Sequence, residues 1–205
     1  MTVIIDYGVG NLFSLTCSFK KIGAEVTVSS DPNIIMRADR LVLPGVGAFE
    51  DAAAKLKNLG LDVVILKKAA EGTPVLGICL GMQLLFERSF EYGEHRGLGL
   101  LAGDIVPFKG AVDSSLKIPH IGWNSVKKLN DCPIFKYVKD GEFVYFVHSF
   151  YAPKCVKSSA LTSEYGIEFT AAVWQNNIFG CQFHPEKSGE TGLNILRAFI
   201  KLGEN

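Results

Sequence analysis

Gly77-Ile78-Cys79-Leu80-Gly81 lies where a buried strand, residues 74–78, turns sharply into a helix. The stretch has the form G-x-C-x-G, the cysteine counterpart of the serine nucleophile elbow. The flanking glycines matter because a side chain at either position would collide with the tight crossing of strand and helix. The turn holds the sulfur of Cys79 at the carboxyl end of the sheet, beside a helix N-terminus that favours the thiolate. Cys79 is therefore a candidate nucleophile, and a buried structural cysteine is the alternative.

Around this turn, strand signals alternate with helix signals. Apolar and β-branched runs predict strands at residues 3–6, 25–29, 40–43 and 74–78. Helical spacing, glycine stops and an Asp31-Pro32 start predict helices at residues 12–22, from 32 onward, at 49–59, at 61–71 and from 80 to about 90. Such alternation implies a parallel sheet covered by helices on both faces.

The second half of the chain has a different character. We expect a long aromatic strand at residues 142–151, a hairpin at 169–183 that turns at Asn176-Asn177, and a final amphipathic helix. No repeat or linker separates the halves, so we expect one domain, residues 1–205. The predicted fold class is α/β: a flavodoxin-like, mostly parallel sheet flanked by helices, with an antiparallel β extension in the second half.

Composition excludes several classes of protein. The 205 residues carry 21 Lys and Arg against 21 Asp and Glu, a formal net charge of zero, so the basic footprint of a nucleic-acid binder is missing. No apolar run approaches the roughly 18 residues of a membrane span, and the N-terminus lacks the features of a secretory signal. The five cysteines include no C-x-x-C pair, which disfavours a zinc site or a disulfide framework. We therefore expect a cytoplasmic protein without a nucleic-acid or membrane partner.

A thiol nucleophile needs a base and a group that orients the base. Among four histidines, His184 follows a predicted strand and precedes Pro185, which favours an extended conformation for it. Residues two apart in extended chain point to the same side, so the Glu186 carboxylate is expected beside the His184 ring. A polar turn after a strand is the alternative, but together with the elbow the pattern predicts a triad of Cys79, His184 and Glu186.

Two further loops contain closely spaced glycines that could serve binding chemistry. Residues 44–47, Pro-Gly-Val-Gly, end the third strand and let the backbone offer N–H groups to a substrate, although a bare turn is also possible. Gly8-Val9-Gly10 follows the first strand, but Phe13 occupies the third glycine position of a dinucleotide loop. The sequence has no phosphate-loop lysine pattern, metal-spaced cluster or H-E-x-x-H motif. We therefore predict no cofactor and no metal.

These features together resemble the triad (class I) glutamine amidotransferase family. Residues 77–83 are similar to its nucleophile motif, and His184-Pro185-Glu186 to its base motif. Further strings narrow the resemblance to one branch, glutaminase subunits that serve a cyclase; they are residues 5–12, 43–47, 119–124, 145–149 and 180–188. The resemblance covers nearly the whole chain.

The resemblance implies a reaction and a set of roles. Cys79 would attack the side-chain amide of L-glutamine and form a glutamyl thioester, which water activated by His184 would hydrolyse. It implies backbone oxyanion donors at Leu80 and at Val46 or Gly47. Gln83 and the backbone at Ser149 and Phe150 match positions that hold the α-amino and carboxylate groups of glutamine.

The resemblance also implies a partner, because free ammonia in water is mostly protonated and unreactive. In this branch the glutaminase docks on a (β/α)8-barrel cyclase and passes ammonia internally for synthesis of imidazole glycerol phosphate and an aminoimidazole carboxamide ribotide. Interface and ammonia-route positions are matched by Asn11, Pro119, Trp123, Tyr145 and Lys187. For each of these residues ordinary packing is the alternative.

Three other functions stay open at the level of sequence. The first is a paralogous glutaminase that feeds another acceptor enzyme, such as a sugar-modifying synthetase. The second is a cysteine hydrolase of the same fold that acts alone on γ-glutamyl compounds. The third is a non-catalytic binding module, since a fold does not fix a function.

Overall fold

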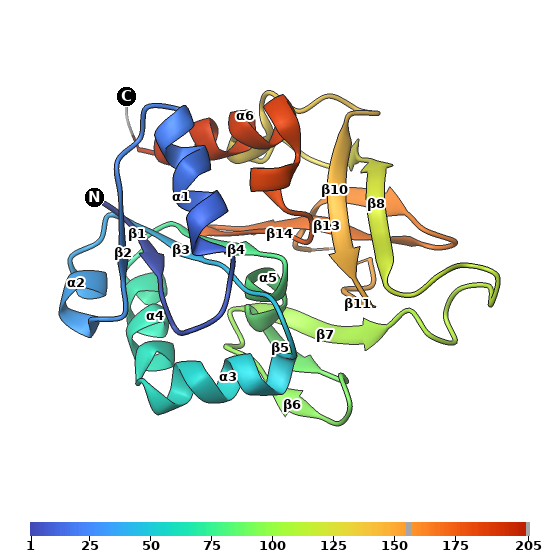
Figure 1. The fold of residues 1–205 in the computed structure, drawn as a ribbon, viewed down its shortest axis with the longest axis horizontal. Helices are drawn as coiled ribbons and strands as arrows, with labels where there is room; N and C mark the ends of the chain where they lie inside the picture. Colours follow the sequence, from blue (N-terminus) through green and yellow to red (C-terminus); the bar gives the residue numbers. More distant parts are fainter. Residues whose placement is uncertain (155–156, 204–205) are drawn as a thin grey trace.

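The computed structural model describes residues 1–154 and 157–203 (Figure 1). Within those ranges no helix combines the length and the apolar character needed to cross a bilayer. Cys79, Cys132 and Cys181 are buried free thiols, whereas Cys17 is exposed. Cys155 lies outside the described residues.

The described residues form one large sheet and two small ones. The large sheet has the strand order β2 (Val26–Ser29), β1 (Thr2–Ile5), β3 (Arg40–Leu43), β4 (Val75–Ile78), β14 (Ile178–Cys181), β13 (Glu168–Gln175), β12 (Ser159–Glu164) and β9 (Lys127–Lys128). One small sheet pairs β10 (Phe143–His148) with β8 (His120–Ser125), and the other has the order β11 (Phe150–Tyr151), β7 (Leu101–Pro107), β5 (Phe86–Ser89) and β6 (His95–Arg96). The helices are α1 (Leu12–Lys21), α2 (Pro32–Met36), α3 (Phe49–Asn58), α4 (Leu61–Ala70), α5 (Leu80–Leu84) and α6 (Gly189–Ile200).

The direction of the strands changes within the large sheet. Strands β2, β1, β3, β4 and β14 pair in parallel, whereas β14, β13, β12 and β9 pair antiparallel. The predicted fold class, a mostly parallel sheet with an antiparallel extension in the second half, is therefore confirmed. In Figure 1 the paired β8 and β10 stand at the end of the molecule away from both termini.

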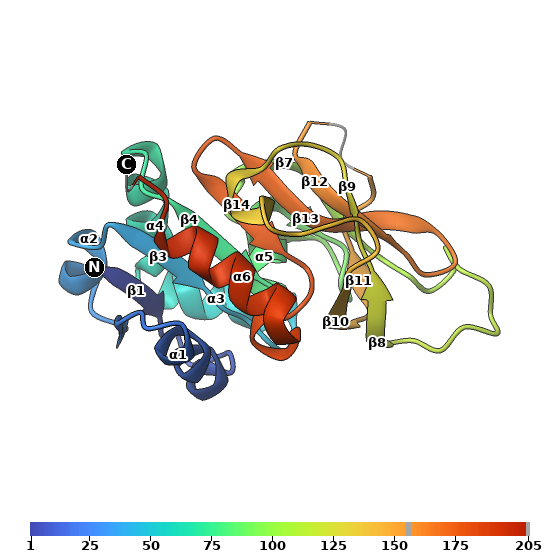
Figure 2. The same cartoon turned by 90° about the horizontal axis from the view of Figure 1, so that it is seen from above.

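Helices cover both faces of the parallel strands, as alternating side chains require. On one face Ile4 and Val42 pack in a cluster with residues of α1 and α6. On the other face Val3 and Leu41 pack in a second cluster with residues of α3 and α4. Figures 1 and 2 show α1 and α6 together on one side of the sheet and α3 and α4 on the other.

The predicted helix start at Asp31-Pro32 and the predicted hairpin are both present in the structure. The side chain of Asp31 accepts a hydrogen bond from the Asn33 N–H at 2.8 Å and caps α2, in which proline occupies the first position. The second-half hairpin is formed by β13 and β14, and Asn176 at its turn has φ 55°. Asparagine tolerates this left-handed conformation better than most residues, so the predicted turn is confirmed.

The predicted helix from residue 80 to about 90 is wrong beyond its first turn. Helix α5 ends at Leu84, and residues 86–89 form β5. The carbonyls of Leu84 and Phe86 accept hydrogen bonds from Leu98 and Gly99, at 2.8 and 3.1 Å. A longer helix would need those carbonyls for its own i to i+4 bonds, so pairing with a later segment ends it.

The predicted strand at residues 142–151 is two strands. β10 ends at His148 and pairs with β8, whereas β11 starts at Phe150 and pairs with β7. The break falls at Ser149, between two sheets. It brings the backbone of Ser149 and Phe150 to the edge where β4 ends.

Candidate active site

The candidate site lies where two neighbouring parallel strands end. β4 and β14 are paired, with Ile78 opposite Cys181. Cys79 follows β4 directly, and His184 follows the end of β14 by three residues. Since the carboxyl ends of parallel strands share one edge of the sheet, residues far apart in the sequence meet there.

The backbone at the nucleophile candidate is strained. Cys79 has φ 54° and ψ −112°, which a residue with a side chain rarely adopts. Its N–H donates to the Cys181 carbonyl at 2.7 Å, which fixes the turn to β14. A Cβ at Gly77 would lie 2.6 Å from the Gly81 oxygen, and a Cβ at Gly81 would lie 1.8 Å from the Leu43 oxygen. Both positions therefore require glycine, because the neighbouring backbone leaves no room for a Cβ atom.

His184 and Glu186 form a buried pair. The His184 backbone is extended, and a hydrogen bond of 2.8 Å joins its Nδ1 to Oε1 of Glu186. The two side chains are 3% and 4% exposed. Because the carboxylate oxygen accepts the Nδ1 hydrogen, the other ring nitrogen, Nε2, is left for the thiol. Among the described residues, Nε2 is buried without a hydrogen-bond partner.

Electrostatics at this pair favour an imidazolium. Burial by itself lowers the pKa of His184, but the Cys79 sulfur and the Glu186 carboxylate outweigh it and raise that pKa to about 10. A charged imidazole between a sulfur and a carboxylate is the arrangement that a cysteine nucleophile needs.

A cavity of about 320 Å³ opens beside the sulfur. Its lining residues are Val46, Gly47, Cys79, Leu80, Gln83, Glu91, Pro119, Val147, His148, Ser149, Phe150 and His184. The structure thus brings the sequence-predicted residues for oxyanion and substrate binding to one cavity, together with two of the three triad candidates. Glu186 lies behind His184, and the remaining predicted residues, Asn11, Trp123, Tyr145 and Lys187, lie outside the lining.

Gln83 is held in place by the protein. Its Nε2 donates to the Phe150 carbonyl and to Oε1 of Gln182, both at 3.0 Å. Nε2 of Gln182 in turn lies 3.9 Å from the Cys79 sulfur. Because both hydrogens of the Gln83 amide are used internally, its oxygen is the atom available to a ligand.

Sequence reasoning missed Glu91, the one carboxylate among the described residues that line the cavity. Its Oε2 accepts a hydrogen bond from the Phe49 N–H at 2.7 Å. Burial raises the pKa of Glu91, although this hydrogen bond lowers it. Glu91 lies just beyond the end of the mistaken helix, and no motif surrounds it. Gln182, one residue from a predicted strand end, was also missed for lack of a local signal.

The residues predicted for an interface lie in three places: an aromatic group on β8 and β10, the cavity lining, and the start of α1. Trp123 of β8 packs edge-on against Tyr145 of β10, with ring centroids 6.0 Å apart, and Nζ of Lys187 lies 5.6 Å from the Tyr145 ring centre. Exposed Pro119 belongs to the lining itself. Asn11 is exposed and caps α1, with its side chain accepting from the Ser14 N–H.

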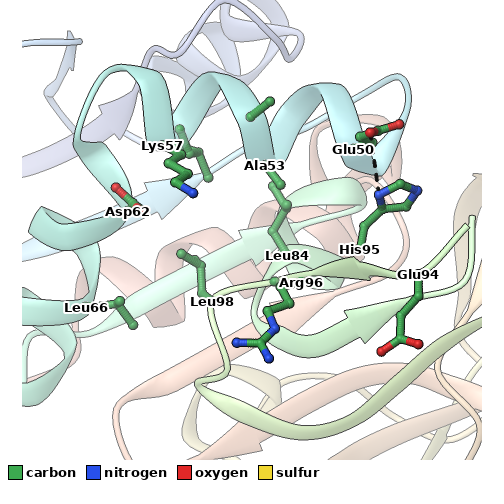
Figure 3. A pocket seen from close by; sticks show the side chains of 13 residues that line it. Glu50, Ala53, Lys57, Asp62, Leu66, Leu84, Glu94, His95, Arg96 and Leu98 are labelled. Carbon is green, nitrogen blue, oxygen red and sulfur yellow. Dashed lines mark ion pairs between the residues drawn. The ribbon is translucent and has the colours of Figure 1, made fainter.

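A larger cavity of about 450 Å³ lies between α3 and β6 (Figure 3). His95 there is 3.7 Å from Oε1 of Glu50, while Leu84 and Leu98 contribute apolar lining. The described residues that line it include no cysteine, serine or threonine, so they offer no hydroxyl or thiol nucleophile. The chemistry therefore points to the smaller cavity at Cys79.

The chain belongs to the class I glutamine amidotransferase family, because the family model "Glutamine amidotransferase class-I" matches residues 3–202. Within that family it is similar over its length to proteins named "Imidazole glycerol phosphate synthase subunit HisH". The protein of that name from Syntrophotalea carbinolica is 48% identical, with 97% of this chain and 98% of the relative covered. The one from Bacillus cereus is 49% identical, with 97% and 93% covered.

The fold is shared more widely than the sequence. The solved structure titled "Structure of PurLQS from Thermotoga maritima" superposes with a TM-score of 0.76 at 22% identity, covering 98% of this chain and 97% of that one. This likeness bears on the fold alone.

Proposed function

We propose that this protein is the glutaminase subunit of an imidazole glycerol phosphate synthase. It hydrolyses L-glutamine to glutamate and ammonia and delivers the ammonia to a cyclase subunit, HisF. The observation that carries the proposal is a sequence identity of 48–49% to HisH proteins over 97% of the chain. The buried His184–Glu186 pair beside Cys79 supports it.

The first half of the reaction forms a thioester. The thiolate of Cys79 attacks the amide carbon of glutamine, and the carbonyl oxygen becomes an oxyanion. The backbone N–H of Leu80 is one donor to this oxyanion, because the first N–H groups of a helix have no partner within the helix. A second donor comes from the loop at Val46 and Gly47. As the intermediate collapses, the C–N bond breaks and the His184 imidazolium protonates the leaving nitrogen.

The second half releases glutamate. His184, now neutral, removes a proton from water, which attacks the thioester carbon. The C–S bond breaks, and the thiolate regenerates beside the imidazolium. Glu186 keeps the Nδ1 hydrogen throughout, so the same ring nitrogen, Nε2, handles both proton transfers.

Glutamine is recognised through its α-amino and α-carboxylate groups. Glu91 supplies the negative charge in the lining that an ammonium group seeks, and the Gln83 amide oxygen can accept a further hydrogen bond from it. Backbone N–H groups at Ser149 and Phe150 suit the carboxylate. The arrangement favours an α-amino acid with a side-chain amide long enough to reach Cys79.

Docking on the (β/α)8-barrel cyclase explains the surface around the cavity. Asn11, Pro119, Trp123, Tyr145 and Lys187 are proposed to contact the cyclase or to line the route of ammonia. The two subunits form a heterodimer in the cytoplasm, and ammonia passes between them without meeting water. We propose that the complex yields imidazole glycerol phosphate and an aminoimidazole carboxamide ribotide.

The test is glutamate release from glutamine by the purified chain, alone and with a cyclase subunit plus its nucleotide substrate. We expect low activity alone and a sharp rise in the complex. Activity that is indifferent to the cyclase would indicate a paralogous acceptor enzyme or a free-standing hydrolase. No activity in a folded, assembled complex would overturn the glutaminase proposal.

A further inference from the structure

Two buried histidines lie outside the proposed triad, and one of them, His148, belongs to the cavity lining. His148, at the end of β10, is 6% exposed, and His120, at the start of β8, is 1% exposed. The two residues are opposite each other in the antiparallel pair, and Nδ1 of His120 lies 3.0 Å from Nε2 of His148. Neither takes part in the chemistry proposed above, so their burial needs another explanation.

His148 reaches the substrate-binding backbone. Its Nδ1 lies 2.8 Å from the carbonyl oxygen of Phe150. A carbonyl can only accept, so Nδ1 must carry the hydrogen. The same oxygen accepts from Gln83 at 3.0 Å. The carbonyl of Ser149 accepts from the Phe108 N–H at 3.0 Å, and in a trans peptide this also fixes the direction of the Phe150 N–H. The Ser149–Phe150 and Phe150–Tyr151 peptides are thereby held.

The tautomer of His148 is in turn set by His120. With Nδ1 of His148 protonated, its Nε2 is an acceptor in the neutral ring, so Nδ1–H of His120 must donate to it. Burial favours the neutral rings, since it lowers the pKa of His120 and lowers that of His148 to about 3.

The outer end of this chain of hydrogen bonds is the side chain of Asn124. Its Oδ1 lies 3.0 Å from Nε2 of His120, and its Nδ2 donates to the exposed Glu164 carbonyl at 2.8 Å. If His120 carries a proton on both ring nitrogens, its Nε2–H donates to Oδ1 of Asn124. If it is neutral, a half-turn of the Asn124 amide lets Nδ2 donate to Nε2, at the cost of one exposed bond. In both states His120 donates inward and His148 donates to Phe150.

Packing prevents the rings from turning. His120 stacks between Tyr165 and Phe146, with centroid distances of 4.0 and 5.0 Å. His148 is enclosed edge-on or tilted by Phe108 and Phe169, at 5.1 and 5.3 Å. Rings held on both sides in this way cannot exchange their nitrogen positions without opening the aromatic cluster.

We propose that His148 and His120 are positioning residues for glutamine: His148 fixes the Phe150 carbonyl by donating from Nδ1, and His120 fixes the tautomer that allows it. The inference rests on the proposed function, and it adds two residues that act through the Phe150 carbonyl rather than on the reacting atoms. It predicts an effect on KM for glutamine rather than on kcat.

The experiment measures kcat and KM for glutamine in the complex with the cyclase and its nucleotide. His148→Phe keeps the ring volume but loses the donor, and we expect KM to rise about fivefold with kcat within about twofold of wild type, as one neutral hydrogen bond predicts. His148→Asn places an N–H where Nδ1 was, and it should restore KM. The same contrast is expected between His120→Phe and His120→Asn.

Phe169→Leu is the matched control, since it removes packing from the same aromatic cluster without touching a hydrogen bond. It should lower the melting temperature and leave KM unchanged. The inference is overturned if His148→Phe behaves like this control, or if His148→Asn fails to restore KM.

A second measurement uses the wild-type protein only, so it does not require any variant to fold. Nitrogen-15 chemical shifts of wild-type histidines should show His148 protonated at Nδ1 and unprotonated at Nε2. The opposite tautomer would overturn the inference even if the enzyme is active. Absence of any glutaminase activity in the wild-type complex would instead overturn the proposed function.

Discussion

At the scale of single residues, burial decides how the His184–Glu186 pair can act. Each side chain is at most 4% exposed, so water screens their interaction very little. The second oxygen of Glu186, Oε2, is buried and has no hydrogen-bond partner among the described residues. The carboxylate charge is therefore directed at the imidazole, which stabilises the imidazolium more than the neutral ring.

This geometry separates the roles of Cys79 and Glu186. Cys79→Ala removes the atom that forms the thioester and should reduce glutamate release in the complex to background. Glu186→Gln keeps an oxygen that can accept from His184 but loses the charge, and we expect a loss of about tenfold, since a charge-assisted bond exceeds a neutral one by about 1–2 kcal/mol. Equal rates in wild type and both variants would contradict the triad assignment.

The pKa of His184 also makes stability depend on pH. That pKa is raised from 6.5 to about 10 on folding, so the folded protein keeps a proton that the unfolded chain has lost between those values. The stabilisation is complete below about pH 6.5 and declines as pH rises toward 10. Urea unfolding of wild type and His184→Phe should give a difference in unfolding free energy that shrinks from pH 6.5 to 9.5.

The Glu186→Gln variant provides the control for this pH dependence. It removes one of the two contacts that raise the pKa of His184. The decline in stability should therefore begin near the same pH, about 6.5, but end at a lower pH than in wild type. A stability difference that stays constant over the whole range would show that His184 does not hold the proton.

At the scale of elements, the turn between β4 and α5 is fixed by backbone contact rather than by side chains. Gly81 faces the Leu43 carbonyl of β3, and Gly45 faces Gly81, where a Cβ would lie 2.7 Å from the Gly81 nitrogen. The two loops that we propose to supply oxyanion donors are thus pressed together. The two loops can lie this close because Gly45 and Gly81 have no side chains.

Gly81→Ala should therefore be far more costly than a substitution at an open glycine. The new Cβ would lie 1.8 Å from the backbone oxygen of Leu43, and we expect a loss of about 3 kcal/mol or more in unfolding free energy. Gly72→Ala is the comparison: Gly72 has φ +86° with nothing within 4 Å, so only backbone strain of about 1–2 kcal/mol is expected. Similar urea midpoints for the two variants would refute the close-contact argument.

The elements that could be predicted from sequence are those specified locally. Strands such as β3 and β4 are continuous apolar runs because both faces are covered, and α2 has its own capping residue and proline. Strands β5 to β9 and β12 were not predicted. β6 and β9 have only 2 residues each, and β9 exists through pairing with the distant β12. Tertiary hydrogen bonds, which a local pattern does not contain, decide that region.

The residues of the candidate site likewise divide into those that a local motif identifies and those that only tertiary packing brings there. Cys79, His184 and Glu186 belong to short motifs whose spacing already implies their mutual geometry. Glu91 and His148 reach the cavity through the turn after β5 and the end of β10, elements whose ends were misjudged. Long-range packing brought them to the site, and no spacing rule identifies them.

At the scale of the whole molecule, the β8–β10 pair connects the cavity to an exposed apolar face. Alternation along β8 turns His120 inward and leaves Ile121 and Trp123 outside, at 59% and 51% exposed. Pro119, just before β8, belongs to the cavity lining. Large exposed apolar side chains side by side on one strand are typical of a surface that another protein covers.

We therefore expect this face to contribute most to docking on the cyclase. Trp123→Ala and Ile121→Asp should each weaken the complex by about 30-fold, because central apolar anchors of an interface cost about 2 kcal/mol when lost. Val63→Asp on α4 is the matched control, since Val63 is an apolar side chain that is 65% exposed but lies on a helix at another face. Binding measured by calorimetry should change for the first two variants and not for the control, with melting temperatures preserved in all three. If Val63→Asp weakened the complex as much as Ile121→Asp, the β8–β10 pair would not be the docking surface, and the ammonia route would have to leave the cavity elsewhere.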